Sequence, residues 1–491
     1  DPDHLNEAAR AVFQRRVATQ LGTFVNALQN DAAAVLAASI QHSSGTRFFV
    51  FNPLGHTRTD VADIATSLPA PLRVVDVTSG LEVRSQLIMK GGQQFLRILA
   101  ENVPSVGYRV YEIQQSASQF ADSAATFSNG NATLENDKYR VTVDGRGAIT
   151  SLVDKRDANR ELVQNIDGRL MNDIGSGSGS LEPENAGAVS ASIYVNSSGF
   201  PAHKTRVTLY RSIDRVDIEN EVTQNFGSTE QTYSFGFNIS GYTVRHEEVG
   251  AVATAKLLNQ GGSYSNDQSK YDFLTMNHFV DLSDLQRGVT LSNWDSPFFK
   301  LGNSAGASID VATPKVMAVI GMRQDGNGFA DQNGDSYFKN RFGLQRHGTY
   351  DQAAAMRMAL EHQNPLVAAY LTGGSGPFPG TSYSMYSISD PDVMLWALKP
   401  AEEGISSGTI ARLWNLSETA QGFSLLFNGT ISDARKTTHI ETNTGTASFT
   451  STSLFDDLPS QRMQTYRLAG TPSFQQNQTT VRVALKVFLE G

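Results

Sequence analysis

The sequence predicts a mainly β protein in which one long N-terminal helix precedes several antiparallel β-domains. Three observations predict this fold class. Apolar residues recur every three to four positions between Leu5 and Ile40, the spacing of one helical face. After Gly45 the apolar period changes to two, which is typical of strands. From about residue 131 to residue 399, many alternating runs come with little helical periodicity, and this density favours a large antiparallel sandwich.

The chain is predicted to have four structured parts. Residues 1–44 form the helical segment, and residues 45–114 form a small β-domain. A polar, Ser/Ala-rich segment from Gln114 to Gly130 reads as a linker. The large sandwich covers residues 131–399, and a small C-terminal β-domain covers residues 400–491. The strand-like runs that predict the two small domains are 48–51, 74–77, 95–99, 108–113, 409–414, 422–427 and 463–468.

Composition excludes several classes of function. The 491 residues include 49 acidic and 40 basic side chains, and the net charge of −9 has the wrong sign for holding nucleic acid or an anionic membrane. No apolar run approaches the length needed to span a bilayer, so no membrane span is expected. The absence of cysteine excludes disulfides, thiolate metal sites and a cysteine nucleophile.

The long helix has no obvious helical partner in the sequence. Its apolar stripe must be covered, either by the sheets that follow or by helices that precede residue 1. The chain begins Asp1-Pro2-Asp3, with neither a methionine nor a leader-like apolar stretch. We therefore expect a processed or truncated product.

Several short motifs occur in one order along the chain and together resemble one family. They are Asn52-Pro53-Leu54-Gly55, the segments 103–108, 134–141 and 147–155, Asp281-Leu282-Ser283-Asp284, Arg287-Gly288-Val289, Asn364-Pro365-Leu366, and the segments 393–395 and 397–399. Each motif alone is weak, but their shared order is specific. In this order they resemble the C-terminal half of the family 38 glycoside hydrolases, the retaining α-mannosidases.

The resemblance implies an architecture and a chemistry. It implies a catalytic barrel and a three-helix bundle, followed by β-domains that include a galactose-mutarotase-like super-sandwich. The helical segment then corresponds to the last helix of the bundle. The implied mechanism uses an aspartate nucleophile, a second carboxylic acid and a zinc ion that holds mannose hydroxyls.

This chain does not carry the family's catalytic motifs. None of its nine histidines is followed two positions later by aspartate, and no His-Asp-Ala-Ile-Thr segment occurs. No nucleophile and no zinc ligand can therefore be transferred onto it. We expect a non-catalytic C-terminal part that completes the substrate cleft and stabilises the catalytic barrel, with mannosides or related glycans as ligands. The zinc of the intact enzyme would be held outside this chain.

Five residues are candidate sugar contacts. Tyr271, Asp272 and His278 cluster where the family's sandwich is expected to face the sugar, and an aromatic ring with a nearby carboxylate suits a sugar. Trp294 lies in a loop that departs from the family's usual Asn-Asp-x-x-Tyr-Gly, and Tyr383 follows the glycine-rich segment 373–376. The alternative is that Tyr271 is a core residue, His278 a turn residue, and Trp294 a residue of inter-domain packing.

One loop has the composition of a calcium site. It concentrates hard oxygen ligands among glycines at Asp325, Asn327, Asp331, Asn333 and Asp335. The spacing is not that of an EF-hand, and the same residues also suit a solvated turn.

Two other functions stay open at this stage. One is a stand-alone carbohydrate-binding or scaffolding β-sandwich protein. The other is an aldose epimerase, which needs a His/Glu pair in one cleft; His203, His246 with Glu247 and Glu248, and His278 are available. The upstream coding sequence separates the first alternative from the hydrolase. About 350 to 450 further residues with His-x-Asp and a nucleophilic Asp would favour the hydrolase.

If the 325–335 loop binds calcium, added calcium raises the midpoint of thermal unfolding and EDTA lowers it again, because a ligand that binds only the folded state stabilises that state. The measurement is a thermal unfolding series with calcium and with EDTA. An unchanged midpoint in both would leave only the turn.

Overall fold

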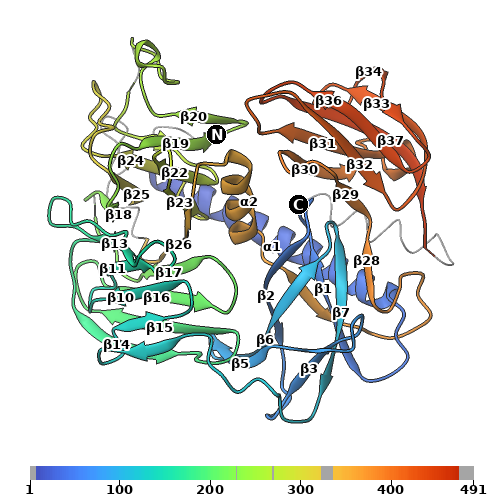
Figure 1. The fold of residues 1–491 in the computed structure, drawn as a ribbon, viewed down its shortest axis with the longest axis horizontal. Helices are drawn as coiled ribbons and strands as arrows, with labels where there is room; N and C mark the ends of the chain where they lie inside the picture. Colours follow the sequence, from blue (N-terminus) through green and yellow to red (C-terminus); the bar gives the residue numbers. More distant parts are fainter. Residues whose placement is uncertain (1–6, 228, 268–269, 322–334, 475–491) are drawn as a thin grey trace. The chain divides into compact units, whose positions relative to one another are not determined.

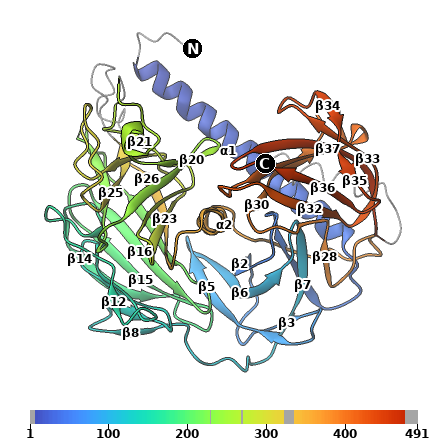
Figure 2. The ribbon, with the colours of Figure 1, turned by 45° about the horizontal axis from the view of Figure 1, so that its top comes forward.

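The structure, a computed structural model, describes residues 7–227, 229–267, 270–321 and 335–474, with side chains from residue 12 onward. Within these residues the fold is mainly β with a long N-terminal helix, as predicted (Figures 1 and 2). The chain divides into two compact units. The first unit holds residues 122–363 and the N-terminal end up to residue 15, and the second holds residues 16–121 and those from 364 onward.

The N-terminal helix α1 runs Glu7–Ser39, close to the predicted limits. Its last turns and the residue after it are buried: Ala32, Leu36 and Ile40 are at most 5% exposed, and Leu36 and Ile40 belong to a hydrophobic core of the second unit. Farther toward the N-terminus the apolar side chains of the helix lie open, with Leu21 59% and Phe24 61% exposed. The stripe expected from the sequence is thus only partly covered within the chain.

The first unit is built from two antiparallel sheets. One has the strand order β21 (Leu274–Thr275), β24 (Phe298–Leu301), β25 (Lys315–Gly321), β18 (Gln231–Gly236), β13 (Met171–Asp173), β11 (Ile149–Asp154), β10 (Tyr139–Val143), β9 (Thr133–Glu135), β8 (Thr126–Ser128), with β12 (Arg160–Glu161) beside β11. The other has the order β14 (Gly179–Glu184), β15 (Ser190–Ser197), β16 (His203–Tyr210), β17 (Val216–Val222), β26 (Phe338–His347), β23 (Gly288–Asn293), β22 (Phe279–Ser283), β19 (Thr243–Glu248), β20 (Ala251–Thr254).

One hydrophobic core joins these two sheets. It takes Val141 and Phe235 from the first sheet and Val207, Ile218 and Leu291 from the second, all at most 1% exposed. Such packing of two inner faces defines a sandwich, so the large sandwich predicted from strand density is present. Because successive strand residues point to opposite faces, the core also fixes which residues face outward.

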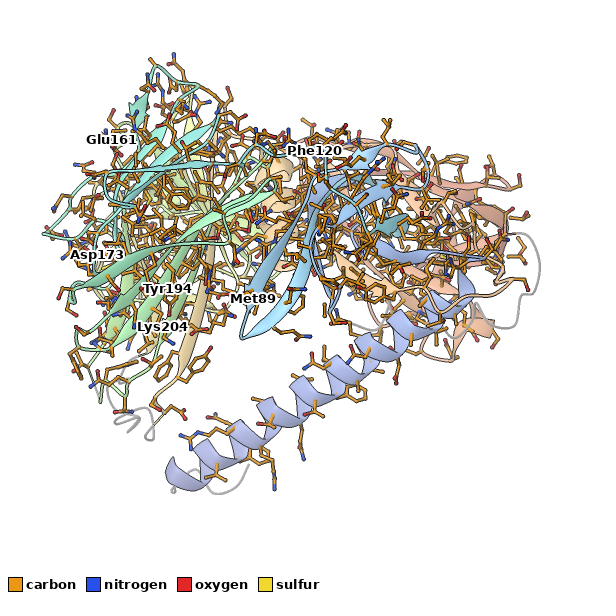
Figure 3. All side chains as sticks on the ribbon, turned by 90° about the horizontal axis from the view of Figure 1, so that it is seen from below. Met89, Phe120, Glu161, Asp173, Tyr194 and Lys204 are labelled. Atoms are coloured by element: carbon orange, nitrogen blue, oxygen red, sulfur yellow. The ribbon has the colours of Figure 1, made fainter. Side chains whose placement is uncertain are left out.

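The outer face of the second sheet is polar over much of its area. Figure 3 labels Tyr194 on β15 and Lys204 on β16, where the strands pair in register with Asn196 opposite Lys204. Both side chains are partly exposed. Over β22, β23 and β26, however, this face is covered by helix α2 (Gln352–Gln363).

The sequence patterns did not predict α2. Five of its twelve residues are alanine or leucine, and it contains no proline or glycine, so its composition suits a helix. Its buried residues are Ala353, Ala355, Met356, Met358, Ala359 and His362. The helix is only twelve residues long and lies between strands, so its apolar pattern is too short to be recognised in the sequence.

The second unit contains four antiparallel sheets within the described residues. The first sheet has the order β27 (Val367–Tyr370), β1 (Thr46–Asn52), β7 (Gly107–Gln114), β3 (Arg73–Asp76), β4 (Glu82–Val83), with β28 (Ser382–Ser384) beside β7, and the second has the order β2 (Arg58–Ala65), β6 (Gln93–Val103), β5 (Ser85–Lys90). The third sheet has the order β29 (Tyr386–Ile388), β32 (Gln421–Phe427), β36 (Ser453–Leu458), β35 (Ser448–Phe449). The fourth has the order β30 (Val393–Pro400), β31 (Thr409–Asn415), β37 (Met463–Pro472), β33 (Gly429–Thr437), β34 (Asn443–Thr446).

Strand β1 is buried on both faces and links two hydrophobic cores. Phe49 and Phe51 enter one core, whereas Phe48 and Val50 enter the other. The continuous apolar run at residues 48–51 is what a doubly buried strand requires. The predicted linker is shorter than expected, because β8 pairs with β9 and joins the sandwich.

Gly107 marks a place where two backbones approach closely. A Cβ atom on Gly107 would lie 2.2 Å from the carbonyl oxygen of Tyr383 on the adjacent strand β28. A backbone oxygen cannot yield as a flexible side chain does. The glycine of the Val103-Pro-Ser-Val-Gly-Tyr motif is therefore required by strand packing.

We predict that Gly107→Ala destabilises the chain by about 1–3 kcal/mol, because the added methyl group overpacks a β-strand contact. Gly445→Ala is the matched control, since it also lies in a strand and its Cβ would meet nothing within 4 Å. Chemical unfolding of both variants measures the difference. Equal free energies of unfolding would contradict the packing argument.

Candidate sugar-binding site at the ends of strands β22 and β23

The candidate site lies where β22 begins and β23 ends. His278 immediately precedes β22, and Asn293 ends β23, with Trp294 directly after it. The Asn293 N–H donates to the His278 carbonyl at 3.1 Å, and Phe279 pairs with Ser292. Antiparallel pairing therefore brings two of the predicted sugar contacts, His278 and Trp294, to the same edge of the sandwich.

A buried carboxylate holds His278 in place. Nδ1 of His278 lies 2.6 Å from Oε2 of Glu247, which comes from the neighbouring strand β19. The Glu247 side chain is 1% exposed and the His278 side chain 20% exposed. The other Glu247 oxygen, Oε1, is buried without a hydrogen-bond partner among the described residues. This pair orients the imidazole at the beginning of strand β22.

Trp294 is held by an arginine that stacks on its ring. The Arg341 guanidinium carbon lies 3.6 Å from the centroid of the Trp294 ring. The same guanidinium forms a two-pronged ion pair with Asp295, with Nε–Oδ2 at 2.9 Å and Nη2–Oδ1 at 2.6 Å. Such planar pairing fixes the arginine geometry. One face of Trp294 is thus occupied, and only its opposite face could stack on a sugar ring.

Residues at the C-terminal end of helix α2 contact the site. His362 near its end meets the Trp294 ring edge-on at 5.7 Å between centroids, and its Nδ1 lies 2.9 Å from the Ser292 hydroxyl. Burial lowers the pKa of His362 to about 4, so its imidazole is neutral near pH 7. The Gln363 side-chain amide donates to the Asn277 carbonyl at 3.1 Å. These contacts brace the loop that carries Trp294.

A second polar pair lies on the same sheet face beneath α2. Asp281 on β22 is fully buried and accepts from Thr290 at 2.8 Å, from Ser283 at 2.6 Å and from Nε2 of His347 at 2.6 Å. Gly288 opposite His347 has no room for a side chain, since a Cβ there would lie 2.5 Å from the imidazole. The three hydrogen bonds offset the cost of burying the carboxylate.

His347 has an altered pKa. Burial alone would lower its pKa, but the hydrogen bond and the charge of Asp281 outweigh burial and raise it above the ordinary value. The imidazole is therefore protonated over a wider pH range than in the unfolded chain. The ion pair contributes fully to stability at low pH and is lost as pH rises through this raised pKa.

The other predicted sugar contacts do not join this cluster in any described interaction. Tyr271 is 5% exposed, meets Tyr264 edge-on at 6.0 Å and donates its hydroxyl to the Ser265 carbonyl. Its position matches the core alternative. Asp272 is partly exposed, and no described contact links it to His278 or Trp294.

Tyr383 belongs to the second unit. It is 8% exposed and packs among aromatic rings, 5.1 Å from Phe378 and 6.3 Å from Tyr108 between centroids. Burial raises the pKa of its hydroxyl. These contacts make Tyr383 a core residue of that unit.

The predicted calcium loop lies mostly outside the described residues. Asp325, Asn327, Asp331 and Asn333 fall there, and only Asp335 is described. The Asp335 carboxylate forms an ion pair with Arg15 at 2.8 Å. Within the described residues, no three His, Asp or Glu side chains gather in a way that could hold a metal ion.

His203 and His246, which were considered for an epimerase, are buried and hydrogen-bonded within the sandwich. Both ring nitrogens of His203 face carbonyls, those of Pro201 at 2.8 Å and Arg146 at 2.7 Å. His246 is fully buried between the Thr275 carbonyl and the Tyr264 hydroxyl, and burial lowers its pKa to about 4. Two His/Glu contacts occur among these candidates, Glu247–His278 at 2.6 Å and Glu248–His246 at 3.9 Å, and the imidazole of His246 is fully buried.

Several residues of the site were not among the sequence candidates. Arg341 and Asp295 are far apart in sequence, and no periodicity shows that they pair. His362 could have been found only by recognising α2. The site as a whole offers carboxylate, amide and imidazole groups beside an aromatic ring, which suits binding of a hydroxylated ring.

Two solved structures share this fold. An alpha-mannosidase from Enterococcus faecalis V583 matches with a TM-score of 0.68 at 13% identity, covering 88% of this chain and 57% of its own. A protein in the glycosyl hydrolase family 38 from Enterococcus faecalis matches with a TM-score of 0.67 at 13% identity, covering 88% of this chain and 60% of its own. The chain shares its fold with a part of these two structures. The resemblance expected from the ordered motifs is confirmed at the level of the fold.

The chain spans less than two thirds of the length of these family 38 structures. A galactose mutarotase-related enzyme from Lactobacillus acidophilus also matches, at a TM-score of 0.27 and 14% identity over 45% of this chain. No family model matches the sequence, and the comparison with curated proteins finds no match.

We predict that the stability contributed by His347 depends on pH. The difference in unfolding free energy between the parent chain and His347→Gln is largest below about pH 6.5, where the imidazole is charged in both states. The difference shrinks as pH rises through the raised pKa of His347. Chemical unfolding between pH 5 and 9 measures it, with the exposed His439→Gln as control. A difference that is constant or grows with pH would contradict the Asp281–His347 pair.

Proposed function

We propose that this chain is the non-catalytic C-terminal part of a retaining α-mannosidase-type glycoside hydrolase. In this function its sandwich completes the substrate cleft, and its helix and β-domains stabilise the catalytic barrel. The observation that carries the proposal is the fold match over 88% of the chain to two family 38 structures that are considerably longer.

The open stripe of α1 supports a contact with a further part of such an enzyme. Val12, Leu21 and Phe24, which are apolar residues of this helix, are 59–62% exposed. Contiguous exposed apolar surface marks interaction sites. We propose that helices of the catalytic part cover this stripe and fix the position of the barrel relative to the β-domains.

The cluster at the ends of β22 and β23 supports the cleft-completing role. It presents His278, oriented by Glu247, beside the Trp294 ring that Arg341 fixes. A rigid aromatic ring with neighbouring polar groups can define one wall of a sugar subsite. We propose mannosides or related glycans as its ligands. Within this proposal, Tyr271 and Tyr383 act through packing and do not touch the sugar.

The chemistry of the proposed enzyme resides outside this chain. The family resemblance transfers no nucleophile onto these residues. The described residues also do not fit a zinc site, since they bring no three His, Asp or Glu side chains together. No step of the proposed function passes through a metal held by this chain.

No helix among the described residues is long and apolar enough to cross a membrane.

We predict that the 491-residue chain alone does not hydrolyse an aryl α-mannoside, with or without added zinc. The polypeptide extended by its upstream coding sequence is expected to hydrolyse it and to lose activity to a chelator, because metal ligands in the extension would hold the ion. Release of the aryl alcohol measures both.

Zinc-dependent turnover by the 491-residue chain would overturn the assignment of a non-catalytic part. An extended polypeptide without hydrolase motifs or activity, in which the sandwich still binds sugar, would instead support a stand-alone carbohydrate-binding or scaffolding protein.

A further inference from the structure

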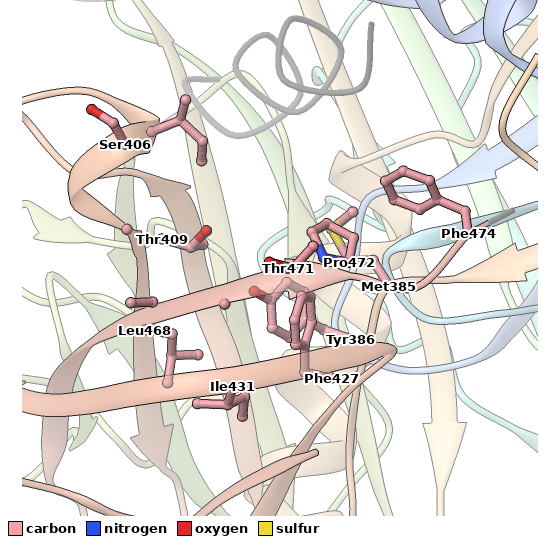
Figure 4. Close-up of a pocket in the computed structure, with 14 residues that line it drawn as sticks. Met385, Tyr386, Ser406, Thr409, Phe427, Ile431, Leu468, Thr471, Pro472 and Phe474 are labelled. Atoms are coloured by element: carbon pink, nitrogen blue, oxygen red, sulfur yellow. The ribbon is translucent and has the colours of Figure 1, made fainter. Parts of the chain in front are cut away.

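The C-terminal sheets of the second unit enclose a pocket that the proposed function does not use. It lies beside β29, β32, β33 and β37, next to the short helix η3 (Ile405–Ser407), and has a volume of about 180 Å³ (Figure 4). All its lining residues belong to the second unit. The pocket is therefore defined within one compact body.

The floor of the pocket is aromatic and aliphatic. Tyr386 and Phe427 stack with their centroids 4.9 Å apart and an interplanar angle of 25°. Ile431 and Leu468, each 4% exposed, complete the floor. A ligand that enters the pocket must therefore present apolar surface to this floor.

Hydroxyl groups are the polar side-chain groups of the lining. Thr409 is 7% exposed and lines the pocket together with Tyr386, and the lining residues Ser406 and Thr471 are exposed. Among the residues that the structure describes, the lining contains no Asp, Glu, Lys, Arg or His. A charged ligand would lose its hydration without gaining a counter-charge, so the pocket favours a neutral one.

The strand arrangement keeps one side of the pocket open. Strand β37 pairs with β31 only as far as Leu468, whereas its pairing with β33 continues to Pro472. Past Leu468 the side of β37 that faced β31 is therefore free of that strand, and it borders the pocket. Gly470 in this stretch carries no side chain that could fill the space, and an added Cβ would lie 2.6 Å from the Thr430 carbonyl oxygen.

We propose that this pocket binds a small neutral ring that is mostly apolar and carries one hydroxyl group, a ligand of the phenol class. The ring would lie against Tyr386 and Phe427, and its hydroxyl would hydrogen-bond the hydroxyl of Thr409. The size agrees, because an apolar cavity of about 150 Å³ accommodates benzene in another protein. A pyranose fits less well, since its many hydroxyls would face Ile431 and Leu468 without partners.

The test uses phenol as the probe and the 491-residue chain, with ligand-observed saturation-transfer NMR as the readout. Ile405→Trp places a large ring in the pocket lining and is expected to abolish saturation of phenol. Leu426→Trp is the matched control, because Leu426 is 46% exposed and is not part of the lining. Phenol is expected to bind this control as it binds the parent chain.

A second variant tests the hydroxyl contact. Thr409→Val keeps the shape of the side chain and removes its hydroxyl, so it is expected to weaken phenol binding about three- to tenfold and to leave toluene binding unchanged. This comparison stays informative even if Ile405→Trp does not fold.

Three results would overturn the proposal: phenol saturation that is equal in all variants, no phenol saturation in the parent chain, or stronger saturation of a methyl pyranoside than of phenol. Equal weakening of phenol and toluene by Thr409→Val would overturn the assigned hydroxyl contact.

Discussion

The core between the two sheets of the sandwich decides where the polar residues of the first unit can go. On β22 and β23 it takes Val280, Leu282, Val289 and Leu291 inward. Strand geometry then sends the alternate residues to the outer face, among them Asp281. A shift of either strand by one residue would exchange the two sets, so the register of the core also holds the polar face in place.

Part of that polar face is covered and paired by other elements. Helix α2 lies over it, and Asp281 receives three hydrogen bonds beneath the helix. At the strand ends the same principle produces the candidate site, where buried Glu247 orients His278 and Asp295 orients Arg341 against Trp294. Rigid supporting contacts of this kind are what a binding wall requires.

The sequence predicted those parts of the molecule that depend on local periodicity. The limits of α1 and the strands at 48–51 and 108–113 follow from apolar spacing, and the sandwich follows from strand density. The ordered motifs predicted the family fold, and Gly107 explains one of them in terms of packing. Periodicity could not reveal α2, whose buried face is short. It also could not show that Arg341 pairs with Asp295, because such contacts depend on strands that are distant in sequence.

Only some of the predicted sugar contacts lie together in the structure, because their positions depend on packing that the sequence does not show. His278 and Trp294 reach one edge because two paired strands begin and end there. Tyr271 and Tyr383 have the same residue type as a sugar platform, yet their rings are buried among other aromatics.

We propose above that a catalytic part of a longer polypeptide covers the exposed apolar residues of α1. Hydrogen exchange of the α1 backbone amides between residues 12 and 31 tests it most directly, measured in this chain and in the polypeptide extended by its upstream coding sequence. We expect fast exchange in the isolated chain and strongly slowed exchange in the extended one. Equally fast exchange in both would contradict it.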